Sequence, residues 1–331
     1  MSDPTLLGPW IRRFLLEHVI KDRNLACNTQ RSYRDALRFL IPFVAEKRKK
    51  AVDRLAVVDL SADLVRHFLV DLETSRHCGI ATRNRRLAAI RAFAHFVGEY
   101  SPAHIEWCGQ IRSIPFKKTG KALVPYLEKL EMHALLGAPN RRTAQGRRDH
   151  ALLLFLYNSG ARASEASQLK IVDVDQHNAC VKITGKGGKQ RLCPLWAVTI
   201  TALAPLIGER PPDEPLFLNR SGQPITRFGI HTLVERHALT ARVKFPSLAS
   251  KRVSPHCIRH SCATHLLRAG VDINTIRGWL GHVSIDTTNI YAEIDLEMKA
   301  KALAKCALTD DLGPRKTWRD QPALMDFLRT L

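Results

Sequence analysis

The sequence predicts a mainly α-helical protein of two domains, with a small β-hairpin in the second domain. A length of 331 residues suits two domains better than one. Apolar residues recur at helical spacing through residues 1–110 and again from 256 to 306, and residues 180–195 alternate around a glycine-rich turn. The predicted boundaries are 1–112 for a helical N-terminal domain, 113–125 for a linker rich in Pro, Gly and Lys, and 126–331 for the second domain.

Three helices are predicted in the N-terminal domain from their capping residues and apolar faces. Asn28-Thr29 is predicted to cap the first helix and Ser61 the second, and the third is predicted to begin at Thr82. The apolar faces are formed by Tyr33, Leu37, Leu40 and Phe43 in the first helix, by Leu64, Val65, Phe68, Leu69 and Leu72 in the second, and by Leu87, Ile90, Phe93, Ala94 and Val97 in the third.

The third helix also carries a run of arginines away from its apolar face. Such a basic face suits a helix laid on a DNA backbone, although an ordinary solvated face is the alternative. The lysines of the linker and the hairpin would serve the same purpose if both domains grip one duplex. The predicted DNA-contacting residues are Arg83, Arg85, Arg86, Arg91, Lys117, Lys118, Lys121 and Lys189.

In the second domain, a helix is predicted from about residue 148 to the break at Asn158-Ser159-Gly160, with a new helix from Ala163. A hairpin follows at 180–195, with Lys186 in its glycine-rich tip. Residues 239–252 are interpreted as a long variable connection. A terminal helix is expected to carry Leu324, Phe327, Leu328 and Leu331 on one face.

The net charge of +20 indicates a polyanionic partner, in most cases nucleic acid. Residues 1–120 carry 21 Lys and Arg against 12 Asp and Glu, and the remainder carries 30 against 19. Because both halves are basic, we expect both domains to face the ligand.

No apolar run reaches the length of a membrane span, and the charged start of the chain is typical of an amphipathic helix rather than a signal peptide. The eight cysteines have no CxxC spacing, which favours reduced thiols in the cytoplasm. We therefore expect a cytoplasmic protein.

Four short segments together indicate phosphoryl transfer. They are Ser159 to Glu165, the hairpin tip, His256 to His260, and Leu280-Gly281-His282 followed by Tyr291. Two arginine side chains are suited to clamping one phosphate through paired hydrogen bonds. A histidine adds a hydrogen bond, a lysine on a hairpin tip protonates the leaving oxygen, and a second histidine serves as the base for a tyrosine nucleophile. A phosphotyrosine link conserves the bond energy, so no cofactor is expected.

Each of these residues has an ordinary structural alternative when taken alone. Arg162 is placed to pair with Glu165 on the surface, Lys186 to be solvated, and Tyr291 to be a half-buried core aromatic. The stretch from His256 to His265 also contains metal-ligand types, but its cysteines do not share the histidine face and Arg259 lies within that face. No metal site is therefore expected.

These segments resemble the boxes of the tyrosine recombinase (phage integrase) family, in its Xer-like bacterial branch. The family pattern Gly-x-Arg-x-Ser-Glu is matched by residues 160–165, the catalytic-lysine hairpin by 185–189, and His-x-x-Arg-His-x-x-Ala-Thr-His-Leu-Leu by 256–267. Leu280-Gly281-His282 and Tyr291 match the last box. The resemblance implies a catalytic set of Arg162, Lys186, His256, Arg259, His282 and the nucleophile Tyr291.

The resemblance further implies a two-lobed clamp, in which a helical core-binding, SAM-like domain and a catalytic domain surround duplex DNA. Cleavage would pass through a 3′-phosphotyrosine intermediate in a tetramer that joins two DNA sites, as a homo-oligomer or with a related recombinase. The terminal helix would dock either on its own domain or on a neighbouring protomer. The biological role is expected to be integration or excision of a mobile element or resolution of chromosome or plasmid dimers. The alternatives are an accessory DNA-binding factor and a type IB topoisomerase-like activity.

Overall fold

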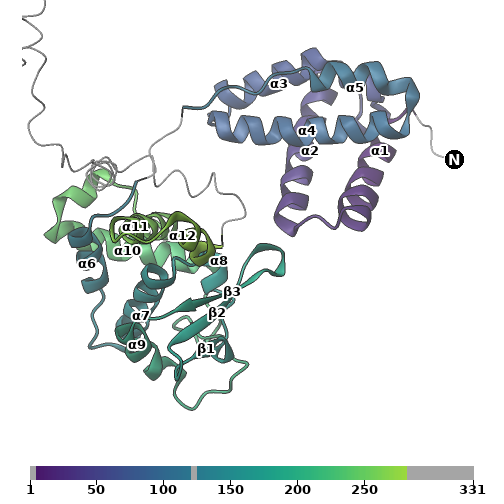
Figure 1. The fold of residues 1–331 in the computed structure, drawn as a ribbon. Helices are drawn as coiled ribbons and strands as arrows, with labels where there is room; N and C mark the ends of the chain where they lie inside the picture. Colours follow the sequence, from purple (N-terminus) through teal and green to yellow (C-terminus); the bar gives the residue numbers. More distant parts are fainter. Residues whose placement is uncertain (1–4, 121–124, 282–331) are drawn as a thin grey trace, which may run out of the picture. The chain divides into compact units, whose positions relative to one another are not determined.

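The structure, a computed structural model, describes residues 5–120 and 125–281, except for the side chain of Lys186. The chain divides into two compact units, residues 1–122 and 123–331 (Figure 1). Each unit has a hydrophobic core of its own. The predicted mainly helical fold with one small sheet is confirmed.

The named secondary-structure elements among the described residues of the first unit are all helical. A π-helical segment, η1, continues directly from the first α-helix, and four further α-helices follow. The α-helices are α1 (Leu7–Arg13), α2 (Cys27–Arg48), α3 (Ala62–Thr74), α4 (Ile80–Tyr100) and α5 (Ile105–Arg112), and the other segments are η1 (Phe14–Asp22), η2 (Val52–Arg54), η3 (Val57–Asp59) and η4 (Pro102–His104).

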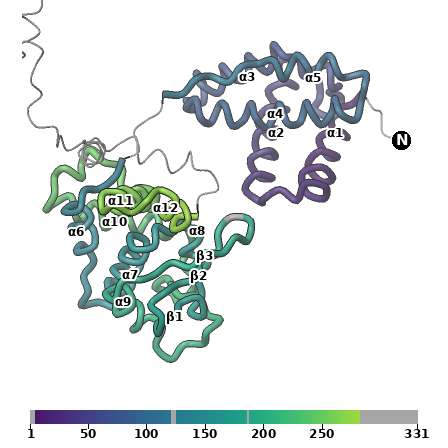
Figure 2. The backbone as a smooth tube through the Cα atoms, in the orientation of Figure 1, coloured from purple at the N-terminus to yellow at the C-terminus, as the bar shows by residue number. Residues whose placement is uncertain are grey.

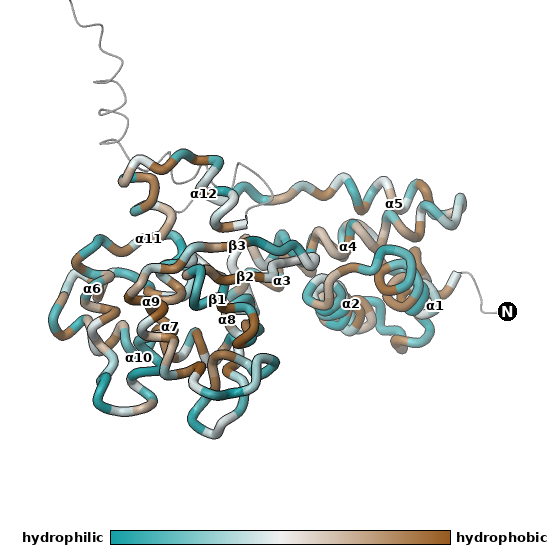
Figure 3. The backbone as a smooth tube through the Cα atoms, turned by 60° about the horizontal axis from the view of Figure 1, so that its bottom comes forward, coloured by the Kyte–Doolittle hydropathy of each residue, from teal (hydrophilic) through white to brown (hydrophobic). Residues whose placement is uncertain are grey.

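The apolar faces predicted for this unit form its core, and Figure 3 shows hydrophobic residues recurring along α4 and α5 between hydrophilic ones. Ser61 accepts a hydrogen bond from the backbone N–H of Leu64, as predicted for the cap of α3. The predicted cap of α2 at Asn28-Thr29 is wrong, and α4 begins before the predicted Thr82. Helix α2 begins at Cys27 and α4 at Ile80, and neither has a side-chain cap, because core packing of the long apolar faces determines these helices.

The second unit surrounds a central helix, α7 (Ala144–Ser159), with further helices and one small sheet (Figure 2). Its other helices are α6 (Lys129–Gly137), α8 (Ala163–Ala166), α9 (Ala197–Ile207), α10 (Arg227–Lys244), α11 (Pro255–Arg268) and α12 (Ile273–Leu280), with short helical segments η5 (Ile171–Asp173), η6 (Lys186–Gly188) and η7 (Pro246–Ser250). The strands are β1 (Val174–Asp175), β2 (Cys180–Thr184) and β3 (Gln190–Pro194).

The sheet is antiparallel in the order β1-β2-β3, and the predicted hairpin is confirmed by the pairing of Thr184 with Gln190 and of Cys180 with Pro194. Gly187 and Gly188 at its tip have φ of 76° and 74°, in the left-handed region that glycine enters without a steric penalty. The tip is closed by the Gly185 N–H, which donates to the Lys189 carbonyl over 2.7 Å.

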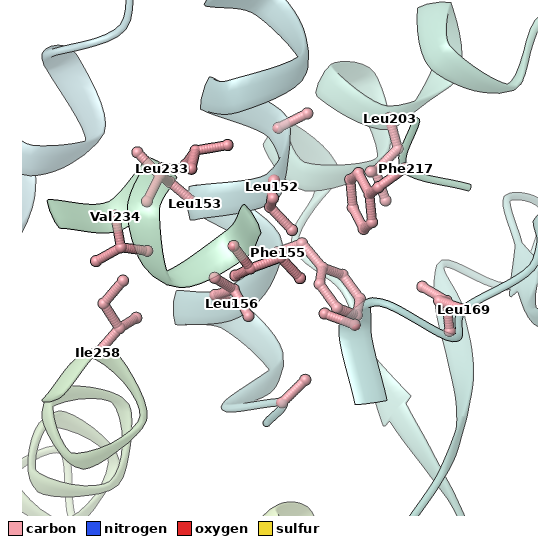
Figure 4. Packing of buried hydrophobic residues seen from close by; sticks show 14 of the residues in the cluster. Leu152, Leu153, Phe155, Leu156, Leu169, Leu203, Phe217, Leu233, Val234 and Ile258 are labelled. Carbon is pink, nitrogen blue, oxygen red and sulfur yellow. The ribbon is translucent and has the colours of Figure 1, made fainter. Parts of the chain in front are cut away.

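Helix α7 is buried on nearly all sides, and its Leu152, Leu153, Phe155 and Leu156 lie among side chains from α9, α10 and α11 (Figure 4). Burial of each such side chain contributes about 1.5–3 kcal/mol to folding. The predicted end of this helix is confirmed, because Gly160 follows Ser159 with φ of 59°.

Asp149 is the one acidic side chain of α7, and it is 1% exposed. Its carboxylate accepts hydrogen bonds from Arg148 at 2.6 Å, Arg236 at 2.6 Å and His237 at 2.8 Å. Burial alone would raise the pKa of Asp149, but the His237 and Arg148 partners outweigh it and lower the pKa. This cluster fixes α7 to α10.

The interpretation of residues 239–252 as a long connection is wrong in its first half. Helix α10 continues to Lys244, and η7 then buries Leu248 completely. The buried positions Ala238 and Ala241 are small, whereas the larger Leu239 between them is 59% exposed, so the apolar spacing of this helix is weak in the sequence. In residues 5–120 and 125–281, no helix is long and apolar enough to cross a membrane.

Candidate active site

Arg162 is placed by the sharp end of α7. After the left-handed Gly160, Arg162 becomes the N-cap of the four-residue helix α8. Its backbone N–H donates to Glu165 Oε2 at 3.0 Å, and its guanidinium donates to Glu165 Oε1 at 2.7 Å. The pairing of Arg162 with Glu165 that was considered as the ordinary structural reading is therefore present, and it orients a half-buried guanidinium.

Glu165 is 5% exposed and connects two arginines. Its Oε2 atom also accepts a hydrogen bond from Arg191 Nη2 at 2.7 Å. Burial acts to raise the pKa of this carboxyl, but the bonds from Arg191 and from the Arg162 backbone outweigh it, so the pKa is lowered. Glu165 is thus an ionised group held between the hairpin and the segment of Arg162.

Arg259 is fixed almost entirely inside the second unit. It is 2% exposed and lies on α11, which begins at the Ser254 cap. Its Nη1 donates to the Gly160 carbonyl at 2.6 Å and its Nη2 to the Leu280 carbonyl at 2.7 Å. Arg259 therefore joins the end of α7, two residues before Arg162, to the end of α12, two residues before His282.

His256 lies one turn before Arg259 on the same helix, with one side exposed to solvent. Its pKa is lowered by partial burial and then by the positive charges of Arg259 and Arg162. Because Arg259 binds the Gly160 carbonyl, α11 and the segment of Arg162 lie side by side, with His256 one turn before Arg259. A histidine with a lowered pKa is neutral at pH 7 and is able to accept a proton.

The neighbouring His260 stacks edge-on against His256, with ring centroids 5.0 Å apart. Burial, His256 and Arg259 lower its pKa to about 4. His260 is therefore an uncharged support for the His256 ring at neutral pH.

The hairpin tip contains Lys186 at the first position of η6. The backbone of this residue is placed, and its side chain is outside the description. Lys189 on the other side of the tip is exposed. His282 and Tyr291 also lie outside the described residues, which end at Gly281. The structure thus brings together Arg162, His256 and Arg259 from the predicted catalytic set.

Two residues of this arrangement were not assigned a role from the sequence. Glu165 was considered only as a surface partner of Arg162, and Arg191 lies in the predicted hairpin, where β-strand alternation alone does not indicate a buried arginine. The signal that was available is charge: Glu165 stands three residues after Arg162, the spacing of a helix-capping pair. Nothing in the sequence indicates the long-range bond to Arg191.

The predicted DNA-contacting arginines of the first unit differ from one another in their surroundings. Arg83 is 7% exposed and donates to the Pro115 carbonyl at 3.1 Å, so it does not belong to the expected solvated basic face. Arg86 lies over the Phe39 ring at 4.6 Å and Arg91 over the Phe116 ring at 4.9 Å.

Arg85 and Lys118 are exposed, whereas Lys117 forms an ion pair with Glu73 at 2.6 Å. Lys121 lies outside the described residues. Contact with DNA stays a prediction for all of these positions. Among the described residues, no group of three or more His, Cys, Asp or Glu side chains is arranged to hold a metal ion.

Family models match both units of the chain. Residues 125–298 match the phage integrase family, and residues 11–98 match the phage integrase N-terminal SAM-like domain. The first match alone covers more than half of the chain, and it includes every candidate catalytic position.

Curated relatives give the same assignment, and a solved structure has a similar fold. The chain is 36% identical to a putative integrase/recombinase, y4rC, of Sinorhizobium fredii, over 100% of both chains. It is 32% identical to the tyrosine recombinase XerC of Pelobacter propionicus, over 87% of this chain and 91% of that protein. Its fold is similar to that of the XerH site-specific recombinase bound to its difH substrate, with a TM-score of 0.64, 24% identity and coverage of 88% of this chain and 83% of that one. The chain therefore belongs to the phage integrase family, as an Xer-like tyrosine recombinase that breaks and rejoins DNA in site-specific recombination.

Proposed function

We propose that this recombinase cleaves duplex DNA with Tyr291 as nucleophile, forming a 3′-phosphotyrosine link, and that Arg162, Arg259 and His256 form the fixed part of its active site. The observation that carries the proposal is the bond from Arg259 to the Gly160 carbonyl, which holds α11, with His256 and Arg259, against the segment in which Arg162 caps α8. Attack on a phosphodiester adds negative charge to the phosphate oxygens, which two guanidinium groups stabilise.

The roles follow from the surroundings of each group. Arg259 is oriented by two backbone carbonyls and Arg162 by Glu165, so little reorganisation is needed when a phosphate arrives. His256 is the base for the tyrosine hydroxyl, because its lowered pKa leaves it neutral at pH 7. Lys186 is the acid for the leaving 5′ oxygen, and His282 donates a further hydrogen bond to the phosphate.

The four described tyrosines have other roles, which favours Tyr291 as nucleophile. Tyr157 is hydrogen-bonded to His265 at 2.7 Å, and burial raises its pKa to about 12. Burial also raises the pKa of Tyr126, whose hydroxyl is bound by Arg268. Tyr33 stacks on Phe14, and the ring of Tyr100 lies under Arg13.

Double-stranded DNA is the proposed partner, supported by the net charge of +20 and by a structural neighbour that is bound to its DNA substrate. We propose a tetramer on two DNA sites in the cytoplasm, formed by this chain alone or with a related recombinase. Integration or excision of a mobile element is the proposed role, because the full-length similarity to y4rC connects the chain with an integrase/recombinase.

Covalent trapping tests the proposal. The protein is mixed, without metal or nucleotide, with nicked duplexes made from the DNA that flanks its gene, then denatured and examined for a protein–DNA adduct. The wild type and the control Tyr100→Phe, which changes an exposed tyrosine, are expected to form the adduct, and Tyr291→Phe is not.

An adduct that survives Tyr291→Phe would assign the nucleophile to another residue. Tight binding without any adduct would favour an accessory DNA-binding role. Relaxation of supercoiled DNA without paired sites would favour topoisomerase-like activity.

A further inference from the structure

We propose that Arg191 is a positioning residue that holds three catalytic segments in register: the one that carries Arg162, the one that leads to Lys186 and the one that leads to His282. This inference rests on the proposed function. It adds to that function a residue that does not itself touch the DNA.

The side chain of Arg191 is anchored on two sides. Arg191 lies on β3 opposite Ile183 of β2, and its side chain is 10% exposed. Its Nη2 donates to Glu165 Oε2 at 2.7 Å, and its Nε donates to the Trp279 carbonyl at 2.9 Å. One side chain of the hairpin thus binds both the carboxylate that orients Arg162 and the last turn of α12.

Two glycines lie directly against the same guanidinium. A Cβ atom added to Gly281 would lie 3.2 Å from Arg191 Nη1 and 3.3 Å from its Cδ. A Cβ atom added to Gly185 would lie 3.7 Å from Nη1 and 3.3 Å from Glu165 Oε1. Gly281 is the residue before His282, and Gly185 is the residue before Lys186. The guanidinium therefore packs against the two glycines that directly precede Lys186 and His282 in the sequence.

The chemistry of arginine explains why this position needs it. The guanidinium is planar, and its donors point in fixed and different directions, so it is able to bond a carboxylate and a carbonyl at once. A lysine at this position has the charge but a single donor atom, and it cannot make both bonds in the same geometry. The site is nearly closed to water, so a lost bond is not replaced at low cost.

The Nε and Nη2 donors of Arg191 bind protein atoms. Loss of Arg191 should therefore slow the reaction more than it weakens DNA binding. A displacement of about 1 Å in a catalytic group is enough to reduce a rate about 100-fold. A misplaced Lys186 should matter only when the leaving group needs a proton. A substrate with sulfur at the leaving 5′ position does not need one, so it separates misplacement of Lys186 from general damage.

The experiment compares Arg191→Lys and Arg191→Gln with Arg210→Lys and Arg210→Gln. Arg210 is a matched control, because it also binds a glutamate, Glu214, at 3.0 Å and backbone carbonyls, including that of Pro215 at 2.6 Å, but none of the candidate catalytic segments. Four quantities are measured for each full-length variant: the thermal midpoint, the Kd for a nicked flanking duplex, and the rates of adduct formation on the ordinary and the 5′-sulfur form of that duplex.

The expected result is a loss of about 100-fold in the rate of adduct formation for the Arg191 variants, with Kd close to that of the wild type. The sulfur substrate should recover a large part of this loss. The Arg210 variants should retain the wild-type rate on both substrates. If Arg191→Gln does not fold, Arg191→Lys decides the question, since it retains the buried charge.

Two outcomes would overturn the positioning role: an unchanged rate in both Arg191 variants, or an equal loss in the Arg210 variants. An equal loss of the Arg191 variants on the two substrates would overturn the positioning of Lys186. A wild-type chain that binds the duplex and forms no adduct would instead refute the proposed function. The two failures are therefore distinguishable.

Discussion

Replacement of Gly160 by alanine tests the packing between the end of α7 and the end of α12. Gly160 has φ of 59°, and an added Cβ atom would lie 2.4 Å from Leu280 Cδ2. The left-handed conformation costs an alanine about 1–2 kcal/mol, and forcing the Leu280 side chain aside costs about 1–3 kcal/mol more. We therefore expect Gly160→Ala to lower the free energy of unfolding of the second unit by about 2–5 kcal/mol.

Gly270→Ala is the matched control for this change. Gly270 also has positive φ, at 87°, but no atom lies within 4 Å of its added Cβ. Gly270→Ala should therefore lower the free energy of unfolding only by the cost of the left-handed conformation, about 1–2 kcal/mol. Native-state hydrogen exchange, measured on peptides from α7 and α11 so that the first unit does not contribute, gives the free energy of opening for both variants. Equal losses in the two variants would refute the role assigned to the contact with Leu280.

Two further predictions concern buried titratable groups. Asp149→Asn removes the negative charge that accepts hydrogen bonds from Arg148, Arg236 and His237, so we expect a loss of about 3–5 kcal/mol in denaturant unfolding. Asp213→Asn, at an exposed carboxylate, should lose less than about 0.5 kcal/mol, and similar losses in both variants would contradict the buried network. His260 has its folded pKa lowered from 6.5 to about 4, so the unfolded chain binds more protons between these values, and stability should fall as pH decreases from 6.5 to 4. His260 contributes at most about 1.4 kcal/mol per pH unit to the slope of the free energy of unfolding against pH. Thermal melts of His260→Gln across this range should therefore depend less on pH than those of the wild type. An unchanged dependence would show that His260 is not the responsible group.

The parts of the fold that the sequence predicted well are those with strong local signals. The glycine-rich turn between two alternating segments specified the hairpin, and the Gly160 break specified the end of α7. The five apolar positions from Leu87 to Val97 were buried as their spacing required. In each case the information lies within a few residues, and the tertiary structure reinforces it.

The errors arose where distant residues decide the outcome. The beginnings of α2 and α4 are determined by the burial of their faces, not by capping side chains. Arg83 was expected on a solvated face but is held by the carbonyl of Pro115, 32 residues later in the chain. Arg191 meets Glu165 and Trp279 only after the hairpin packs against α12, and no local pattern contains that contact.

The burial of α7 determines where this enzyme is able to move. The helix is enclosed by the core on nearly all sides, and its last turn leads directly into Gly160 and the carbonyl that binds Arg259. A shift of either arginine would require repacking of that core, which is the part of a protein that opens least often. Among the described residues, the segments that hold the two arginines are therefore a stationary reference. An adjustment between an idle and a reacting enzyme is easier at a peripheral element such as the hairpin tip, where two successive glycines permit rotation.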